Sequence, residues 1–152
     1  MEQQDIRELK VSDIAHEEWP TLGPQETVEG AIKVFAESGI SGVPVVEGER
    51  LVGIVTDRDI VVRAIADGKD FSTPIGDVMT TEIYSVKPDD FVFEAIRLMG
   101  DRQVRRVPII NEKGAIVGII AMADVALETE DEREIAETLE EISSGAGFWK
   151  KG

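Results

Sequence analysis

The chain has 152 residues, about the length of one average domain, and 42% of them are hydrophobic while 31% are charged, a balance typical of a folded protein. Acidic residues outnumber basic ones by 31 to 16, and the net charge of -15 argues against binding to nucleic acid or to an anionic membrane. Cysteine is absent, which excludes disulfides, thiolate nucleophiles and cysteine-bound zinc. No apolar run approaches the ~20 residues that span a bilayer, and the polar N-terminus shows no secretory signal. We therefore expect a cytoplasmic protein.

The first half of the chain predicts a helix, a hairpin and a second helix after an N-terminal extension, residues 1–10. Residues 27–38 carry apolar side chains at helical spacing, and Gly39 predicts the helix end. Two short runs rich in branched aliphatic residues, 43–46 and 51–55, flank a Glu-Gly-Glu turn and predict a β-hairpin. Thr56 then opens a helix that extends to about residue 67.

The second half predicts the same order after a linker at residues 68–76. We expect a strand near 83–86, a helix over 91–100, a hairpin across 106–120 and a helix from Ala121. Residues 128–152 form an acidic tail, in which Ile135, Leu139 and Ile142 make one apolar stripe and predict a capping helix. Each half therefore has the order strand, helix, strand, strand, helix.

The two halves are an internal repeat at an offset of 64 residues. Asp13-Ile14 recurs as Asp77-Val78, and the Val-Pro-Val-Val run at 43–46 recurs as Val-Pro-Ile-Ile at 107–110. One extra turn residue then makes the offset 65, so that Asp59 matches Asp124. A copy of about 60 residues is small for an independent core. We therefore expect the copies, residues 11–67 and 77–127, to pack together around a pseudo-twofold axis.

Three motifs of the repeat carry a resemblance to a known family. They are Asp-Val-Met-Thr at 77–80, the two Val-Pro runs, and Gly-Ile-Val-Thr-Asp-Arg-Asp at 53–59, which is similar to the Gly-x-x-Thr-x-x-Asp signature of CBS domains. Over residues 11–127 the chain resembles a tandem CBS domain pair, or Bateman module. The resemblance implies an α+β fold of two β-α-β-β-α repeats, and a non-catalytic sensing module that binds adenosine-type ligands in the clefts between the copies.

The signature also has an interpretation from its residues alone. A strand that runs directly into a helix at Thr56 presents free N–H groups and partial positive charge, which suit a phosphate. The Thr56 hydroxyl adds a donor, and the Asp59 carboxylate is placed to accept the hydroxyls of a ribose. The alternative is a capping box, in which Thr56 and Asp59 only cap the helix and no ligand is needed.

The resemblance implies two clefts, each of which combines the signature of one copy with segments of the other. The first would use Ile54, Thr56, Asp59, Tyr84, Ser85, Val104 and Arg106. The second would use Ile119, Ala121, Asp124, Thr21, Leu22, Ile40, Ser41 and Val43. We expect tighter binding in the first, because Ala121 lacks the hydroxyl of Thr56. Arginine suits phosphate because its planar side chain can donate two parallel hydrogen bonds. Arg105 and Arg106 are the candidates in the first cleft. The alternative is that they pair with nearby acidic residues.

No catalytic residue and no metal site are predicted. His16 is the only histidine, and beside Glu17 and Glu18 we expect it to be a solvated surface residue rather than a metal ligand. No nucleophile with a positioned base stands out, so we do not expect an enzyme or a catalytic cofactor.

Two helices predict a partner surface. Residues 56–67 and 121–127 are apolar nearly all round, which predicts burial on more than one side and hence a homodimer through these helices. The function we expect is a stand-alone regulatory module that binds AMP, ADP or ATP, with S-adenosylmethionine or NADH as other adenosyl ligands, and acts on an effector protein that the sequence does not identify. The alternative is a ligand-free protein–protein interaction scaffold built on the dimer.

Overall fold

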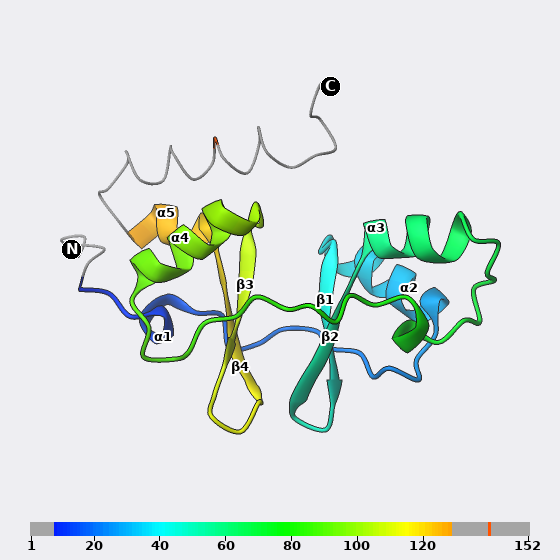
Figure 1. Ribbon diagram of the computed structural model, residues 1–152, viewed down its shortest axis with the longest axis horizontal. Helices are drawn as coiled ribbons and strands as arrows, with labels where there is room; N and C mark the ends of the chain where they lie inside the picture. The colour runs from blue at the N-terminus through cyan, green and yellow to red at the C-terminus, as the bar shows by residue number, and fades with distance from the viewer. Residues whose placement is uncertain (1–7, 129–139, 141–152) are drawn as a thin grey trace. The chain divides into compact units, whose positions relative to one another are not determined.

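The computed structural model describes residues 8–128 and residue 140 and divides into two units, one of which joins segments far apart in the sequence (Figure 1). In the described residues, one unit combines 8–19 with 84–128, and the other contains Pro20–Ile83. Each unit has one antiparallel hairpin, and we name the units after it. The β3–β4 unit contains the N-terminal segment, and the β1–β2 unit contains the middle of the chain.

The β1–β2 unit begins with helix α2, Val28–Ser38. The Thr27 hydroxyl accepts a hydrogen bond from the Gly30 amide at the start of α2, and Gly39 ends it in the left-handed conformation, with φ 73°. The hairpin pairs β1, Gly42–Glu47, with β2, Arg50–Thr56. Its inward side chains pack on α2, and the core consists mainly of aliphatic residues, including Val28, Ala31, Val43, Val45 and Val55.

The strand β2 continues directly into α3, Asp57–Asp59, and then into a π-helix, η1, Ile60–Ile65. The predicted helix from Thr56 to about residue 67 is therefore present, but its second part has wider turns, since the Ala66 amide bonds to the Val61 carbonyl. On η1, Ile60 and Ala64 are buried in the core while Val61, Val62 and Ile65 are exposed.

The stretch predicted as a linker, residues 68–76, packs within the β1–β2 unit. The Val28 amide bonds to the Thr73 carbonyl and the Ile75 amide to the Glu26 carbonyl. A short 3-10 helix, η2, Ile75–Asp77, follows, and Ile75 is fully buried. An apolar side chain held in the core in this way makes the segment part of the unit rather than a free connection.

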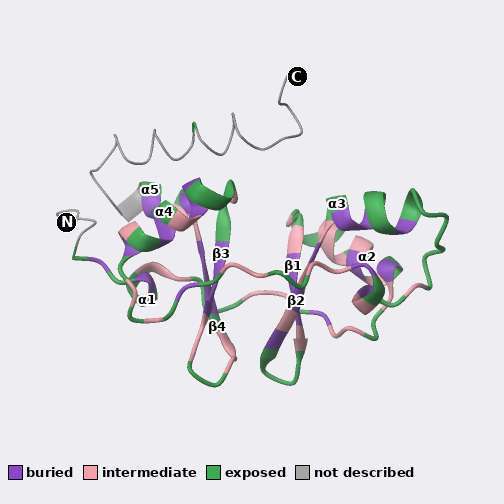
Figure 2. Ribbon diagram, in the orientation of Figure 1, coloured by how far each residue is buried: buried purple, intermediate pink, exposed green. Residues whose placement is uncertain are grey.

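The β3–β4 unit repeats the arrangement with α1, Val11–Ile14, added from the N-terminus. Helix α4, Val92–Arg102, precedes the hairpin of β3, Arg106–Ile110, and β4, Ile116–Ala121, and α5, Met122–Glu128, follows it. Buried positions occur along β3, β4, α4 and α5 (Figure 2), and their side chains form one core. They include Ile96, Met99, Val107, Ile109 and Ile120.

The opening strand of each repeat is shorter than predicted. The strand expected near 83–86 is a single bridge from Val86 to Ile109, and its counterpart is a bridge from Leu22 to Val45. Proline follows two residues later in both copies, and it has no N–H to continue the ladder. The order predicted for each repeat is confirmed in a reduced form, with one bridge in place of the first strand.

The tail expected to form a capping helix, with Ile135, Leu139 and Ile142, lies outside the described residues. Within the part of the chain that the structure describes, we find no helix with the length and apolar character needed to cross a bilayer.

Candidate ligand-binding site

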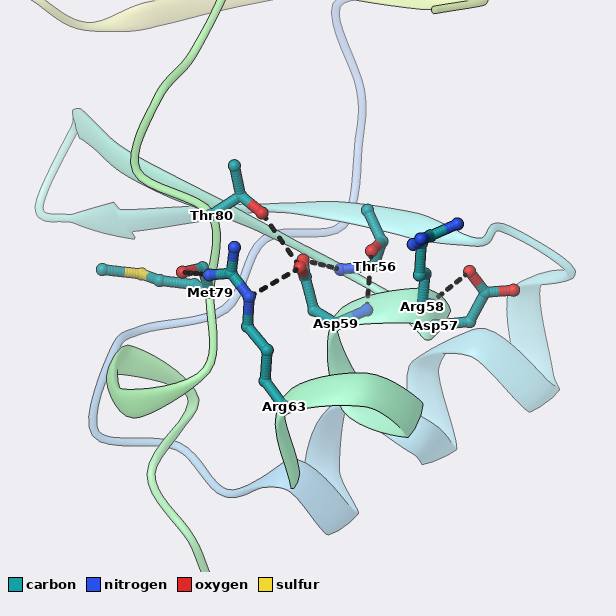
Figure 3. Close-up of polar contacts among 7 residues, drawn as sticks. All are labelled: Thr56, Asp57, Arg58, Asp59, Arg63, Met79 and Thr80. Carbon is teal, nitrogen blue, oxygen red and sulfur yellow. Dashed lines mark hydrogen bonds and ion pairs between the residues drawn. The ribbon is translucent and has the colours of Figure 1, made fainter. Parts of the chain in front are cut away.

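The junction between β2 and α3 forms a reciprocal capping box (Figure 3). The Asp59 amide donates to Thr56 Oγ1 at 3.0 Å, and the Thr56 amide donates to Asp59 Oδ2 at 2.9 Å. The capping arrangement weighed in the sequence analysis is therefore present. The Thr56 hydroxyl can still bind a ligand, because an oxygen that accepts one hydrogen bond keeps its own proton to donate.

Asp59 is the buried charged residue of this junction, with 7% of its surface exposed. Its Oδ1 accepts a hydrogen bond from the Thr80 hydroxyl at 2.9 Å and lies 3.8 Å from Arg63 Nε. Buried carboxylates need such partners, because burial without them is strongly unfavourable. Asp59 is thus held in one orientation, with a cation beside it (Figure 3).

The segment that supplies Thr80 lies against β2. Ile54 and Thr80 exchange backbone hydrogen bonds of 2.9 and 2.8 Å. A Cβ atom added to Gly53 would lie 2.5 Å from Met79 Sδ and 3.1 Å from the Thr80 carbonyl, so the first glycine of the signature permits this close approach. Sequence reasoning missed Thr80 as a site residue, although it ends the Asp-Val-Met-Thr motif that supported the family resemblance.

The second signature has the same backbone arrangement with a different partner. The Ala121 amide donates to Asp124 Oδ2 at 3.0 Å, and Asp124 Oδ1 lies 2.6 Å from His16 Nε2. His16 and Ile119 exchange backbone hydrogen bonds of 2.9 Å each. His16 is exposed at the surface, as expected, and its ring is in addition paired with a signature carboxylate 108 positions away.

The arginines proposed for phosphate lie on exposed positions of the β3–β4 unit. The Arg106 guanidinium stands over the Trp19 ring, 5.8 Å from its centroid, and Arg102 stands over Tyr84 at 4.4 Å. The Arg105 carbonyl accepts the Met122 amide. The contact of Arg106 is with an aromatic face, which leaves the edge of the guanidinium able to donate to an anion.

The residues predicted for each cleft are divided between the two units. The β1–β2 unit contains Thr21, Leu22, Ile40, Ser41, Val43, Ile54, Thr56 and Asp59. The β3–β4 unit contains Tyr84, Ser85, Val104, Arg105, Arg106, Ile119, Ala121 and Asp124. Within each unit, the structure brings the signature residues together with a segment that precedes the other repeat's helix.

The repeated hairpin, helix and signature define a tandem pair of small α+β domains. The chain belongs to the CBS domain family, whose model matches residues 11–65 and 75–131. It is 35% identical over 133 residues to the CBS domain-containing protein YhcV of Bacillus subtilis, covering 88% of this chain and 94% of that protein.

Solved structures agree with this assignment. Hypoxic response protein I, whose structure holds two coordinated zinc ions, is similar with a TM-score of 0.71 and 34% identity over 78% of this chain and 97% of that one. The CBS domain pair of MJ0100, in complex with 5-methylthioadenosine and S-adenosyl-L-methionine, is similar with a TM-score of 0.67 and 25% identity over 78% of this chain and 93% of that one.

Proposed function

We propose that this protein is a regulatory module that binds an adenosyl ligand through Thr56 and Asp59. The observation that carries the proposal is the orientation of Asp59, a carboxylate with 7% exposure that is fixed by Thr56 and Thr80 at the end of a strand. The adenosyl class is supported by the similar CBS pair of MJ0100, which is described with two adenosyl ligands.

The chemistry of the junction fits the two ends of a nucleotide. A carboxylate has about four acceptor positions, and hydrogen bonds to the Thr56 amide and the Thr80 hydroxyl use two of those on Asp59. The others are available to the paired hydroxyls of a ribose. The Thr56 hydroxyl can donate to a phosphate, and hydrogen bonds to a charged group contribute about 1.5–3 kcal/mol.

Within this class, we propose AMP, ADP or ATP ahead of neutral adenosyl ligands. A net charge of -15 repels anions unless bases gather locally, and Arg105 and Arg106 are exposed neighbours on one strand end. Their contribution, with that of Tyr84, Ser85 and Val104, stays a prediction. Replacing Arg105 and Arg106 together by glutamine should weaken AMP more than 5-methylthioadenosine, and equal losses would assign them a structural role.

The experiment that tests the proposal is calorimetric titration with AMP, ADP, ATP, 5-methylthioadenosine, S-adenosylmethionine and NADH. Asp59→Asn keeps one oxygen for the Thr56 amide but removes the charge, and we expect it to weaken binding at least tenfold. The matched control is Asp124→Asn, which should change the affinity of the site at Thr56 and Asp59 little. If none of these ligands binds, the ligand-free scaffold becomes the better description.

We also propose a homodimer through the surface of η1. Val61, Val62 and Ile65 are exposed by 56%, 49% and 51%, and large aliphatic side chains gathered on one turn mark an interaction surface. A second copy of the chain fits this surface because an isologous contact pairs the apolar patch with itself. Ligand binding would then be communicated to an effector protein, in a cytoplasmic role that is regulatory rather than catalytic.

A further inference from the structure

The two signature carboxylates occupy corresponding positions in their units but have different side-chain partners. Thr80 lies 64 positions after His16, and each exchanges two backbone hydrogen bonds with its signature strand, Thr80 with Ile54 and His16 with Ile119. Each side chain then contacts Oδ1 of the signature carboxylate, at 2.9 Å for Thr80 with Asp59 and 2.6 Å for His16 with Asp124. His16 is therefore the structural counterpart of Thr80.

The cations beside the carboxylates also differ. Asp59 has Arg63 at 3.8 Å, and a guanidinium keeps its charge at every physiological pH. The corresponding position 65 residues later is Glu128. At the second signature, His16 thus stands where the first has a hydroxyl, and when protonated it places a positive charge beside Asp124. Histidine changes its charge between about pH 5 and 8.

The charged groups around His16 lie on segments other than the strand with which its backbone pairs. Strand β4, which pairs with the His16 backbone, has no charged side chain in Ile116–Ala121. The Asp13 side chain on α1 accepts a hydrogen bond from the Lys10 amide. The centroid of the Trp19 ring lies 6.2 Å from that of the His16 ring and 5.8 Å from the Arg106 guanidinium carbon. The titratable and charged groups on the elements packed there are Lys10, Asp13, Glu17, Glu18, Arg105, Arg106, Asp124 and Glu128.

We propose that His16 is a positioning residue for Asp124 and that its protonation makes the second signature respond to pH, whereas the first does not. A protonated ring donates a charge-assisted hydrogen bond to Asp124, roughly twice as strong as a neutral one. It also offsets the carboxylate charge and so favours an anionic ligand. A neutral ring donates more weakly, or presents a lone pair to the carboxylate in its other tautomer. The effect on Asp124 needs no ligand, while the effect on binding rests on the proposed function.

The ligand-free test uses NMR between pH 5 and 8, where the ring signals of the only histidine are unambiguous. We expect the Ala121 amide, which donates to Asp124, to shift along the His16 titration curve. Asp124→Asn should remove that shift, and His16→Thr, which copies position 80, should remove it while keeping the Ile119 amide protected from exchange. The Thr56 amide, which donates to Asp59, is the internal control and should not follow the curve. The proposal would be overturned if the chemical shift of the Ala121 amide did not change with the His16 ring signals, or if it changed equally in Asp124→Asn.

The ligand test compares AMP binding by Asp59→Asn, which weakens the first signature, with binding by Asp59→Asn/His16→Thr at about pH 5.5 and 7.5. The AMP phosphate itself titrates near pH 6, so the quantity that matters is the affinity ratio of the two proteins at each pH. We expect this ratio to be about fivefold larger at the lower pH. An unchanged ratio would refute the effect on binding. If Asp59→Asn binds no AMP while His16 and Ala121 stay coupled, the effect on binding is refuted and the positioning role stands. Absence of AMP binding by the native chain would instead refute the proposed function.

Discussion

The Thr80 hydroxyl donates a hydrogen bond of 2.9 Å to Asp59 Oδ1, although the two residues are 21 positions apart and belong to different sequence repeats. His16 and Asp124 have the same relationship across 108 positions. Each unit therefore contains the hairpin and signature of one repeat and the opening segment of the other. In each unit, the signature carboxylate is one of the groups that hold this opening segment through a side-chain contact.

Removing the Thr80 hydroxyl should destabilise the β1–β2 unit. In Thr80→Val the buried Asp59 loses a hydrogen bond to a charged group, and we expect the free energy of unfolding to fall by about 1.5–3 kcal/mol. Thr80→Ser keeps the hydroxyl and should lose much less. Urea denaturation of both variants measures the difference, and equal stabilities would show that Arg63 and the Thr56 amide suffice for Asp59.

The Thr56 hydroxyl should set the difference in affinity between the two signatures. Thr56→Ala copies Ala121 and should weaken AMP binding by about ten- to a hundredfold. Ala121→Thr installs the hydroxyl and should strengthen the weaker site. Thr56→Ser, which keeps both the cap and the donor, is the control in calorimetry. If Thr56→Ala bound AMP as tightly as the native chain, backbone amides would hold the phosphate without the hydroxyl.

Gly53 should not tolerate a side chain. In Gly53→Ala the added Cβ meets Met79 Sδ at 2.5 Å and the Thr80 carbonyl at 3.1 Å, and overpacking of this kind costs about 1–3 kcal/mol. Gly30→Ala is the opposite case, because its Cβ has only the Thr27 hydroxyl at 3.7 Å and alanine favours a helix by up to about 1 kcal/mol. Thermal unfolding should show a lower Tm for Gly53→Ala and a higher one for Gly30→Ala. Two shifts of the same sign would contradict the packing argument.

The ends of α2 and α4 predict a pair of opposite stability effects. Gly39 ends α2 with φ 73°, while the equivalent Gln103 ends α4 with φ 58°. A residue with a Cβ is strained in this conformation by about 1–2 kcal/mol, partly offset in glycine by its larger unfolded-state entropy. Gln103→Gly should therefore stabilise by about 0.5–1 kcal/mol, and Gly39→Gln should destabilise by a similar amount. Chemical denaturation of the two variants tests this, and a destabilised Gln103→Gly would show that contacts of the glutamine side chain outweigh the strain.

The proposed dimer should dissociate when a charge is placed on η1. Val61→Glu introduces a carboxylate at a side chain that is 56% exposed, so it should leave the monomer folded while disfavouring an apolar contact. Val117→Glu changes another exposed valine, at 42%, which belongs to β4 of the other unit. Sedimentation velocity should give dimers for the native chain and for Val117→Glu but monomers for Val61→Glu. A native chain that sediments as a monomer at micromolar concentration would remove the proposal.

The local elements of this protein follow from short-range patterns in its sequence. Apolar spacing with Gly39 at the end specified α2, and the aliphatic runs around a glycine turn specified the hairpin of β1 and β2. The capping box of Thr56 and Asp59 was also readable, because both of its hydrogen bonds join residues three positions apart. Such features depend on backbone conformation and on neighbours within one turn.

The segment that packs against each signature depends on the fold of the whole chain and cannot be predicted from a local pattern. The identity of the partner of Asp124 depends on a chain path of 108 residues, and no local pattern distinguishes His16 from an ordinary surface histidine. The role of Thr80 and the burial of Ile75 in a stretch expected to be a linker have the same origin. The segments that contain Thr80 and His16 are short and are stabilised by their hydrogen bonds to a signature strand and to its carboxylate. That strand and carboxylate reach each segment only when the rest of the chain folds.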